Sequence, residues 1–258
     1  MKFILPKARD PRFVHLAKIA AEKGHDVITY ENELPAEKGV FFLPLSLCEE
    51  KLLAALKNIP DQSTVFAGKS CEEAARLAKE KNLRITCLLD EKRYLIKNAE
   101  HTAEGVLAEI ISRTDRRLDD LCLLVYGYGN CGRAIARLLW LCGSEVWVWS
   151  RERGQALAEK DGFNLFPAQE RGLGMFDGVV NTVPAPIFSH ELLGTMQKGS
   201  SFFQVASGNS GIDPDEAKAL GIRFIPLHGL PGKYAPASEA DAIWEEVTCA
   251  LDIKRSIL

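Results

Sequence analysis

Short apolar runs alternate with amphipathic stretches along the first hundred residues. Runs of four to six residues that are rich in Val, Ile, Phe and Thr predict strands at 2–5, 26–30, 40–43, 64–67 and 84–89. Between them, apolar residues at helical spacing predict helices around 13–24, 49–57 and 71–81. Strands that alternate with helices are typical of a parallel, doubly wound sheet. We therefore expect residues 1–97 to form an α/β domain with a flavodoxin-like sheet, on the substrate side of the protein.

The same alternation resumes further along the chain. Further strands are predicted at 121–126, 145–149, 178–181, 202–205 and 223–225, and helices at 131–142 and 155–160. We expect residues 98–258 to form a second α/β domain, a Rossmann domain. A helix over 102–113, with Thr102 as its N-cap, would join the two domains. An amphipathic closing helix over 238–253 is expected to return to the first domain.

A glycine-rich turn follows the strand predicted at 121–126. The turn contains the GxGxxG pattern, formed by Gly127, Tyr128, Gly129, Asn130, Cys131 and Gly132. Alone this spacing is weak evidence, but here it has the strand, turn, helix and second strand that a dinucleotide site requires. Gly127 would allow the sharp turn, Gly129 the approach of a pyrophosphate, and Gly132 close packing of helix on strand. The start of the helix would supply unpaired N–H groups to the phosphates.

The end of the strand at 145–149 indicates which dinucleotide is bound. An NAD site usually has an acidic residue there to hold the ribose 2′-hydroxyl. This chain has Ser150 and Arg151, with Arg153 nearby, and a hydroxyl and guanidinium groups can bind a 2′-phosphate. The pattern favours NADP over NAD. Two alternatives stay open: the arginines are solvated loop residues, or Glu152 reaches a ribose hydroxyl.

Composition narrows the class of protein. The chain of 258 residues is 47% hydrophobic with a net charge of −3, which gives no electrostatic field for nucleic acid, and no apolar stretch is long enough to span a membrane. The seven cysteines are scattered without a CxxC pair, and the histidines lack ligand spacing, so we expect no metal site and a protein of the reducing cytoplasm. Gly68 and Lys69 resemble the tail of a phosphate-binding P-loop, but Ser63 stands where that motif needs glycine. We interpret them as substrate-side residues at a strand end.

Four further segments carry polar or rigid residues at predicted strand or helix ends. Asn181, Thr182, Val183 and Pro184 end a strand beside the expected nicotinamide ribose, although a simple polar turn is the alternative. Ser207 follows the next strand, and the loop from His228 to Pro236 contains Gly232 and Lys233. The fourth segment is Thr102-Ala103-Glu104-Gly105, where Glu104 is either a reacting group or an N3 capping residue.

Together these segments resemble the A subunit of dipicolinate synthase. The resemblance rests on NAEHTAEG, GYGNCGRAIARLLWLCGSEVWVWSR, VVNTVPAPIF, FFQVASG and HGLPGKYAP, in the order and approximate spacing of that family. It covers residues 98–236 well and the first hundred residues only in layout. Two basic residues that the family usually has, after Ser207 and after Pro236, are replaced here. The cofactor half therefore fits the family better than the substrate half.

The resemblance implies an NADP-dependent oxidation of dihydrodipicolinate to dipicolinate during spore formation, with the flavoprotein-like B subunit of dipicolinate synthase as partner; we also expect a homo-oligomer. Lys233 and the helix start at Thr102 and Ala103 would hold the substrate carboxylates. Ser207 and Asn181 would position the ring and the nicotinamide, and Glu104 or His228 would be the base. A D-2-hydroxyacid dehydrogenase would need an arginine where Gly208 stands. A diverged oxidoreductase on another small acid and a silent NADP-binding regulatory subunit remain alternatives.

Overall fold

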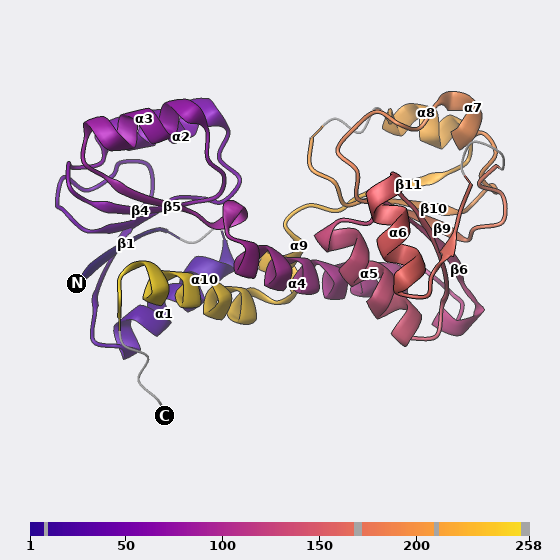
Figure 1. Cartoon of the computed structure of the whole chain (residues 1–258), viewed down its shortest axis with the longest axis horizontal. Coiled ribbons are helices and arrows are strands. Elements are labelled where there is room, and N and C mark those ends of the chain that lie inside the picture. The colour runs from indigo at the N-terminus through magenta and orange to yellow at the C-terminus, as the bar shows by residue number, and fades with distance from the viewer. Residues whose placement is uncertain (8–9, 168–171, 209–211, 254–258) are drawn as a thin grey trace. The chain divides into compact units, whose positions relative to one another are not determined.

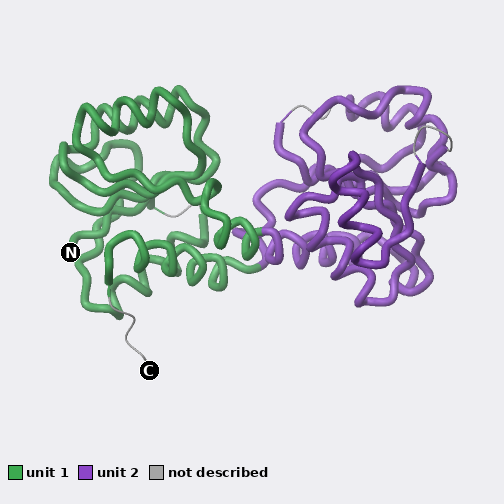
Figure 2. The backbone as a smooth tube through the Cα atoms, in the orientation of Figure 1, with its two compact units in different colours: residues 1–98, 235–258 green, residues 99–234 purple. Residues whose placement is uncertain are grey.

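The computed structural model describes residues 1–7, 10–167, 172–208 and 212–253. The chain forms two compact units, shown in different colours in Figure 2. Unit 1 contains residues 1–98 and 235–258, and unit 2 contains residues 99–234. Unit 1 is therefore built from both ends of the chain, and unit 2 lies between them in sequence.

Unit 1 is a parallel sheet covered by helices on both faces (Figure 1). Its strands run in the flavodoxin-like order β2-β1-β3-β4-β5. They are β1 (Lys2–Pro6), β2 (Asp26–Tyr30), β3 (Val40–Phe42), β4 (Thr64–Ala67) and β5 (Arg84–Cys87). The helices are α1 (Pro11–Glu22), α2 (Glu49–Asn58), α3 (Glu72–Glu80) and α10 (Pro236–Ala250), and a 3-10 turn η1 (Leu88–Asp90) follows β5.

Unit 2 is a parallel sheet with strand order β8-β7-β6-β9-β10-β11, the Rossmann order. The strands are β6 (Cys122–Tyr126), β7 (Glu145–Trp149), β8 (Asn164–Leu165), β9 (Gly178–Asn181), β10 (Ser201–Gln204) and β11 (Arg223–Pro226). The helices are α5 (Asn130–Leu141), α6 (Glu152–Lys160), α7 (His190–Leu193), α8 (Pro214–Ala219) and α9 (Leu230–Tyr234), and η2 (Leu118–Asp120) precedes β6. The predicted fold class, two doubly wound parallel sheets of which the second is a Rossmann sheet, is confirmed.

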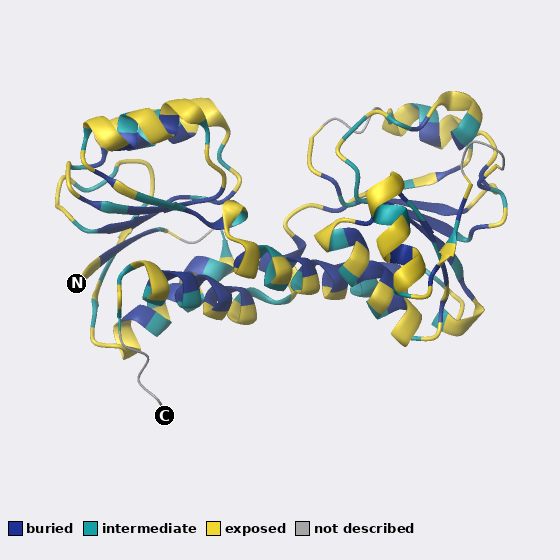
Figure 3. Cartoon of the chain, viewed as in Figure 1, coloured by how far each residue is buried: buried dark blue, intermediate teal, exposed yellow. Residues whose placement is uncertain are grey.

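Each sheet has a hydrophobic core on both faces, and the central strands are the buried interior of each unit in Figure 3. In unit 1, α1 and α10 pack on one face around Phe3, and α2 and α3 pack on the other around Phe41. In unit 2, one core joins α5 and α9 to the sheet, and the other joins α7 and α8 to it. Because both faces are covered, the strands read as short continuous apolar runs rather than as alternating ones.

The joining helix differs from its prediction. Helix α4 spans Lys92–Ile111, so it begins ten residues before the predicted start at 102. The residues that face the cores at helical spacing extend back to the first turns of the helix: Tyr94, Ala99, Ala103, Val106 and Ile110 are all buried. Polar residues between Lys97 and Thr102 hid this stripe in the sequence. The prediction of Thr102 as an N-cap, and of free N–H groups there, is therefore wrong.

Smaller differences concern short elements and the closing segments. The stretch from Leu230 to Tyr234 is a helix, α9, where a rigid loop was predicted. The closing helix α10 spans Pro236–Ala250 rather than 238–253, and it belongs to unit 1. Strand β8 and helices α7 and α8 were not predicted, because elements of two to six residues carry too little periodicity.

Two further findings concern membrane-spanning helices and cysteines in the described part of the chain. None of its helices is both long and apolar enough to cross a membrane. All seven cysteines are free, but Cys48 and Cys249 are exposed and only Cys87 is fully buried.

Candidate dinucleotide site

The glycine turn lies where the strand order of unit 2 reverses, between β6 and β9. Strand β6 ends at Tyr126 and β9 ends at Asn181, and the two strands are neighbours. Gly127 has φ +102, a conformation that favours glycine, and its N–H donates to the Trp149 carbonyl at 2.7 Å. A Cβ at Gly127 would lie 2.4 Å from Oγ1 of Thr182. Thr182 therefore fills the space beside the turn, and its hydroxyl donates to the Tyr126 carbonyl at 3.0 Å.

The other two glycines of the motif have different surroundings. A Cβ at Gly132 would lie 2.0 Å from the Gly127 carbonyl oxygen, so only glycine lets α5 pack this close to the turn. A Cβ at Gly129 would meet nothing within 4 Å. Gly132 is required by packing within the protein, whereas Gly129 opens onto free space. That is the division of roles expected of a turn that admits a pyrophosphate.

The start of α5 can receive an anion. Its N-cap is Gly129, so no side chain accepts from the first N–H groups of the helix. The positive end of the helix dipole and these N–H groups face the space in front of Gly129. The residues present thus fit the diphosphate of a dinucleotide.

Tyr128 supports the turn from within. Its side chain is buried, and its hydroxyl donates to Oδ2 of Asp161 at 2.7 Å. Nε of Arg133 donates to the same oxygen at 2.6 Å, and the arginine and the tyrosine hold the pKa of the Asp161 carboxyl below its usual range. This network links the start of α5 to the end of α6. The side chain of Tyr128 therefore stabilises the turn, and only its backbone is available to a ligand.

A second group of polar residues begins α6, directly after β7. Ser150 is buried, and its hydroxyl lies where a Cβ of Gly154 would come within 2.0 Å. Arg151 is the N-cap of α6 and makes no side-chain cap, and both Arg151 and Arg153 are exposed. A hydroxyl, two exposed guanidinium groups and an uncapped helix start can together bind a phosphate. Glu152 shares the first turn and would oppose it.

Asn181 lies in a buried amide pair and not on a ligand-accessible surface. Its Nδ2 donates to Oε1 of Gln204 at 2.9 Å and to the Val183 carbonyl at 3.2 Å, and its Oδ1 accepts from the Val183 N–H at 3.0 Å. Nε2 of Gln204 donates to the Ala206 carbonyl at 2.9 Å. The pair therefore fixes the loops that follow β9 and β10. A direct hydrogen bond from the Asn181 side chain to a nicotinamide ribose is not compatible with this arrangement.

Two of the segments that resemble the family, the one that contains Gly105 and the one that contains Leu230, pack against each other within unit 2. A Cβ at Gly105 would lie 2.7 Å from Cβ of Leu230, so glycine allows α4 and α9 to touch. Next to this contact, the carboxylate of Glu109 accepts from Nζ of Lys233 and from the Tyr234 hydroxyl, both at 2.6 Å.

The Glu109 carboxylate is buried, and Arg113 forms a further ion pair with it. Burial acts to raise its pKa, but the bonds from Lys233 and Tyr234 and the charge of Arg113 leave the pKa of Glu109 lowered. The bond to Glu109 in turn raises the pKa of Lys233. Lys233 thus neutralises an internal carboxylate, where it was predicted to hold a carboxylate of the substrate.

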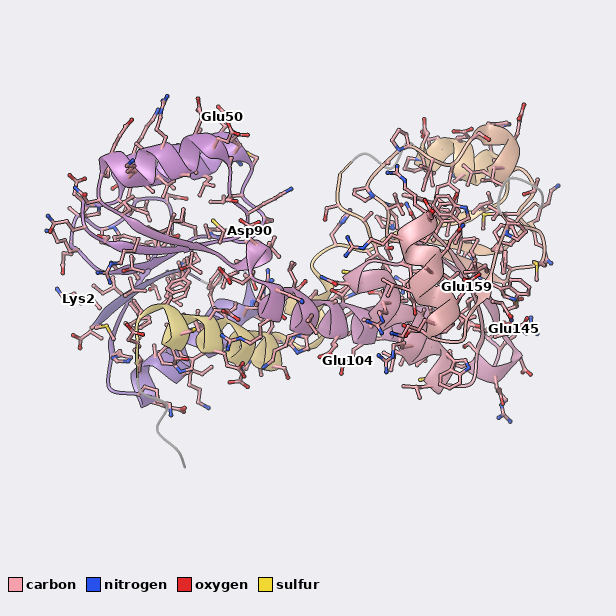
Figure 4. All side chains as sticks on the ribbon, in the orientation of Figure 1. Lys2, Glu50, Asp90, Glu104, Glu145 and Glu159 are labelled. Carbon is pink, nitrogen blue, oxygen red and sulfur yellow. The ribbon has the colours of Figure 1, made fainter. Side chains whose placement is uncertain are left out.

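The remaining predicted residues fall into two groups. Ser207 and His228 are exposed and follow β10 and β11 at the same edge of the sheet as the glycine turn. Glu104 is exposed on α4 (Figure 4). Three others are buried, Thr102 and Ala103 on α4 and Gly232 on α9.

Gly68 and Lys69 belong to unit 1. Gly68 is buried, because a Cβ there would lie 1.9 Å from the Leu45 carbonyl oxygen, whereas Lys69 is exposed. Of the segment after Ser207 that departs from the family, residues 209–211 lie outside the described residues.

Sequence reasoning missed Gln204, Glu109 and Asp161. Gln204 is a polar residue inside an apolar strand, and Glu109 stands between Val106 and Ile110 on an apolar helix face. A polar residue in a buried pattern needs a partner. That signal could have found the first two, whereas nothing in the exposed pattern around Asp161 distinguishes it.

The chain is similar in sequence to two kinds of known protein. No model of a known protein family matches the chain. Over 185 residues, 70% of the chain, it is 28% identical to the A subunit of dipicolinate synthase of Bacillus subtilis, and the match covers 62% of that protein, less than two thirds of its length. Over 80 residues, 26% of the chain, it is 40% identical to the shikimate dehydrogenase (NADP(+)) of Thermus thermophilus, of which the match covers 30%.

The fold is also similar to a solved structure of the same kind. The crystal structure of the dipicolinate synthase A subunit from Bacillus halodurans superposes with a TM-score of 0.80 at 23% identity, over 97% of both chains. At this identity the likeness shows the fold. The resemblance to the A subunit of dipicolinate synthase that the motifs indicate is thus confirmed in sequence and in fold.

Proposed function

We propose that the chain is an NADP-dependent oxidoreductase that oxidises dihydrodipicolinate to dipicolinate, as the A subunit of a dipicolinate synthase. The observation that carries the proposal is the glycine cradle and uncapped start of α5 at the reversal of a Rossmann sheet. The similarity to the dipicolinate synthase A subunit in sequence and fold supports the substrate. The free cysteines support a place in the reducing cytoplasm.

The cofactor would lie across the carboxyl edge of the unit 2 sheet. The turn from Gly127 to Gly132 would hold the diphosphate, and Ser150, Arg151 and Arg153 would hold a 2′-phosphate. A relative whose name includes NADP(+) supports NADP over NAD. Thr182, Val183 and Pro184 would line the next stretch of the cofactor. When bound, NADP accepts a hydride, and the substrate ring loses a proton as well and becomes aromatic.

The chain's own residues would place the ring and take the proton. Ser207 and His228 are exposed at the edge where the nicotinamide would lie, so we assign Ser207 to ring placement and His228 to the base, with Glu104 as the other candidate base. Asn181 and Gln204 position the loop that carries Ser207. Lys69 remains a cation for a substrate carboxylate in unit 1, whereas Lys233 is committed to Glu109.

The similarity to a synthase subunit also bears on the partner, the cellular process and the oligomeric state of the chain. A relative whose name makes it the A subunit of a synthase supports a partner, the B subunit. We propose that the partner is flavoprotein-like, that the pair acts in spore formation, and that the chain forms a homo-oligomer.

Turnover tests the proposal directly. The full chain, alone and with a B subunit encoded beside it, would be incubated with dihydrodipicolinate and NADP. We expect NADPH and pyridine-diacid absorbance to rise together. Tight NADP binding without turnover under both conditions would refute the synthase.

Two observations favour a second function, a catalytically silent NADP-binding subunit. Lys233, a candidate for substrate recognition, is paired with Glu109, and the two basic residues usual in the family are absent. The absence of turnover would support this function, or an oxidoreductase acting on another small acid.

The cofactor assignment has its own prediction. Arg151→Ala removes one charge-assisted contact to a 2′-phosphate, so NADP affinity should fall about tenfold while NAD affinity stays unchanged. Fluorescence titration with NADPH and NADH measures both. Lys160→Ala, at the far end of α6, is the matched control. An equal loss for the two cofactors would exclude the 2′-phosphate role.

A further inference from the structure

A cavity at the amino edge of the unit 2 sheet, opposite to the glycine turn, is lined by cationic side chains. Its volume is about 230 Å³, and it lies across the starts of β6, β9, β10 and β11 beside the end of α4. Dinucleotides bind at the carboxyl edge of such sheets, so the cofactor does not use this cavity. Four cationic and two acidic side chains line it: Arg113, Arg116, Lys198, Arg223, Asp115 and Asp177.

Carboxylates pair with two of these cations, Arg116 with Asp177 and Arg113 with Glu109, and leave the other two without an acidic partner among the described residues. Both oxygens of Asp177 are engaged, one by Nη1 of Arg116 and one by the Cys122 N–H, each at 2.8 Å. Within the described residues, neither Lys198 nor Arg223 forms an ion pair with a carboxylate. The lining therefore has an excess of positive charge that an anion would compensate.

The two cations without acidic partners, Lys198 and Arg223, lie against neighbouring parts of unit 2. A Cβ added at Gly221 would lie 3.4 Å from Cγ of Lys198, so the stem of this lysine runs along the glycine. Nη1 of Arg223 donates to the Arg113 carbonyl at 3.1 Å and fixes that guanidinium at the end of α4. Other N–H groups of Arg223 remain available. The cations thus come from two walls, the turn before β10 and the start of β11.

The rest of the lining suggests the kind of ligand. Ser201 supplies a hydroxyl, whereas the Ser200 hydroxyl already donates to the Gln197 carbonyl at 2.7 Å. Ile110, Leu123 and Phe203 form an apolar floor. Since a water occupies about 30 Å³ in the liquid, the volume suits a compact molecule rather than a peptide segment. Cations on two walls suit a ligand with more than one negative charge.

We propose that this cavity is a second ligand site of the chain, which binds a small dianion, either phosphate or a small dicarboxylate. Binding there does not depend on the proposed function. A dicarboxylate would connect the site to the proposed reaction, because its product is a diacid, whereas phosphate would indicate an independent effector.

The test is calorimetric titration of the full chain in a phosphate-free buffer at fixed ionic strength. The probes are inorganic phosphate and pyridine-2,6-dicarboxylate, and chloride is the control for ionic strength. We expect one dianion per chain, and the probe with the higher affinity identifies the source. Lys198 is exposed on a turn, so Lys198→Ala should fold normally and weaken binding about tenfold.

Two variants separate this site from the alternatives. Lys160→Ala removes an exposed charge elsewhere in unit 2 and should leave binding unchanged, as should Arg151→Ala at the proposed cofactor site. Three results would overturn the inference. Neither probe binds, Lys198→Ala and Lys160→Ala have the same dianion affinity, or Arg151→Ala rather than Lys198→Ala lowers that affinity. If the wild-type chain binds a dianion in this cavity but does not bind NADP, only the proposed function is contradicted.

Discussion

In both units the first strand leads into a helix at the point where the strand order reverses, but the two helices begin with different charges. In unit 1, Asp10 caps α1: its carboxylate accepts from the Arg12 N–H at 3.1 Å and pairs with the Arg12 guanidinium. In unit 2, the cap of α5 is Gly129, which has no side chain. Since the start of a helix attracts negative charge, α1 carries its own anion, whereas α5 is free to receive one. Similar parallel sheets can thus differ in ligand binding through a single capping residue.

The largest effect should come from the glycines of the α5 turn. Gly132→Ala places a methyl group 2.0 Å from the Gly127 carbonyl oxygen, so it should lower both Tm and dinucleotide affinity. Gly129→Ala meets nothing within 4 Å, so it should keep Tm and lower affinity at least about tenfold by filling the ligand's space. Thermal unfolding and NADPH titration measure the two properties. If Gly129→Ala binds NADPH like the wild type, the cradle is not where the diphosphate lies.

The second-largest effect should come from the buried amide pair of Asn181 and Gln204. Asn181→Leu leaves the Gln204 amide without its partner, so the free energy of unfolding should fall by about 1–3 kcal/mol in urea. Gln204→Leu should cost a similar amount, and the double variant less than the sum, because the two side chains satisfy each other. Strictly additive losses would show that the pair does not act as a unit.

Removing the capping residue of α1 tests the same contrast between the two helix starts in unit 1. Asp10→Ala should lower the free energy of unfolding by about 1 kcal/mol, since α1 loses its capping acceptor. Asp10→Asn keeps the acceptor and serves as the control. NADPH affinity should stay unchanged in both variants. A loss of affinity would mean that the start of α1 contributes to cofactor binding.

The smallest expected effect is a pH dependence confined to unit 1. The ring of His25 stacks on Phe3 at 4.9 Å, and its buried Nε2 has no hydrogen-bond partner. Burial, together with the nearby N-terminal charge, lowers the pKa of His25. The folded state therefore disfavours the protonated ring, and its contribution to stability is present above about pH 6.5 and declines as the pH falls below it.

His25→Phe should remove this dependence. Urea unfolding between pH 5 and pH 8 should show a shallower slope for the variant than for the wild type. Equal slopes would indicate that the ring has the same pKa in the folded and unfolded states.

The sequence was sufficient for the elements that bury many apolar residues. The strands from β1 to β7 and from β9 to β11 were predicted near their observed positions, because a fully covered parallel sheet produces short apolar runs. The glycine turn was predicted because its strand and helix context is local. The start of α4 was not, because the buried positions in its first turns are separated by polar residues whose partners lie on α10, such as Glu239 for Asn98.

Residue roles were harder to predict than residue positions. Lys233 and Asn181 were predicted to contact ligands, but in the structure they pair with Glu109 and Gln204, which are distant in sequence or fixed by strand pairing. A lysine that would suit a substrate carboxylate suits an internal carboxylate equally well. Only the tertiary structure distinguishes the two.

The division of unit 1 between both ends of the chain has a consequence for biosynthesis. Its sheet is complete once Cys87 has been made, but the core on one face also needs Ile243, Trp244 and Val247 of α10. These residues leave the ribosome only after all of unit 2. Domains generally fold as they emerge, so unit 2 can finish folding first while the earlier sheet still has one apolar face uncovered. A chain that stops before α10 would therefore keep that apolar face exposed. Unit 1 can complete its core only after the last helix has been synthesised.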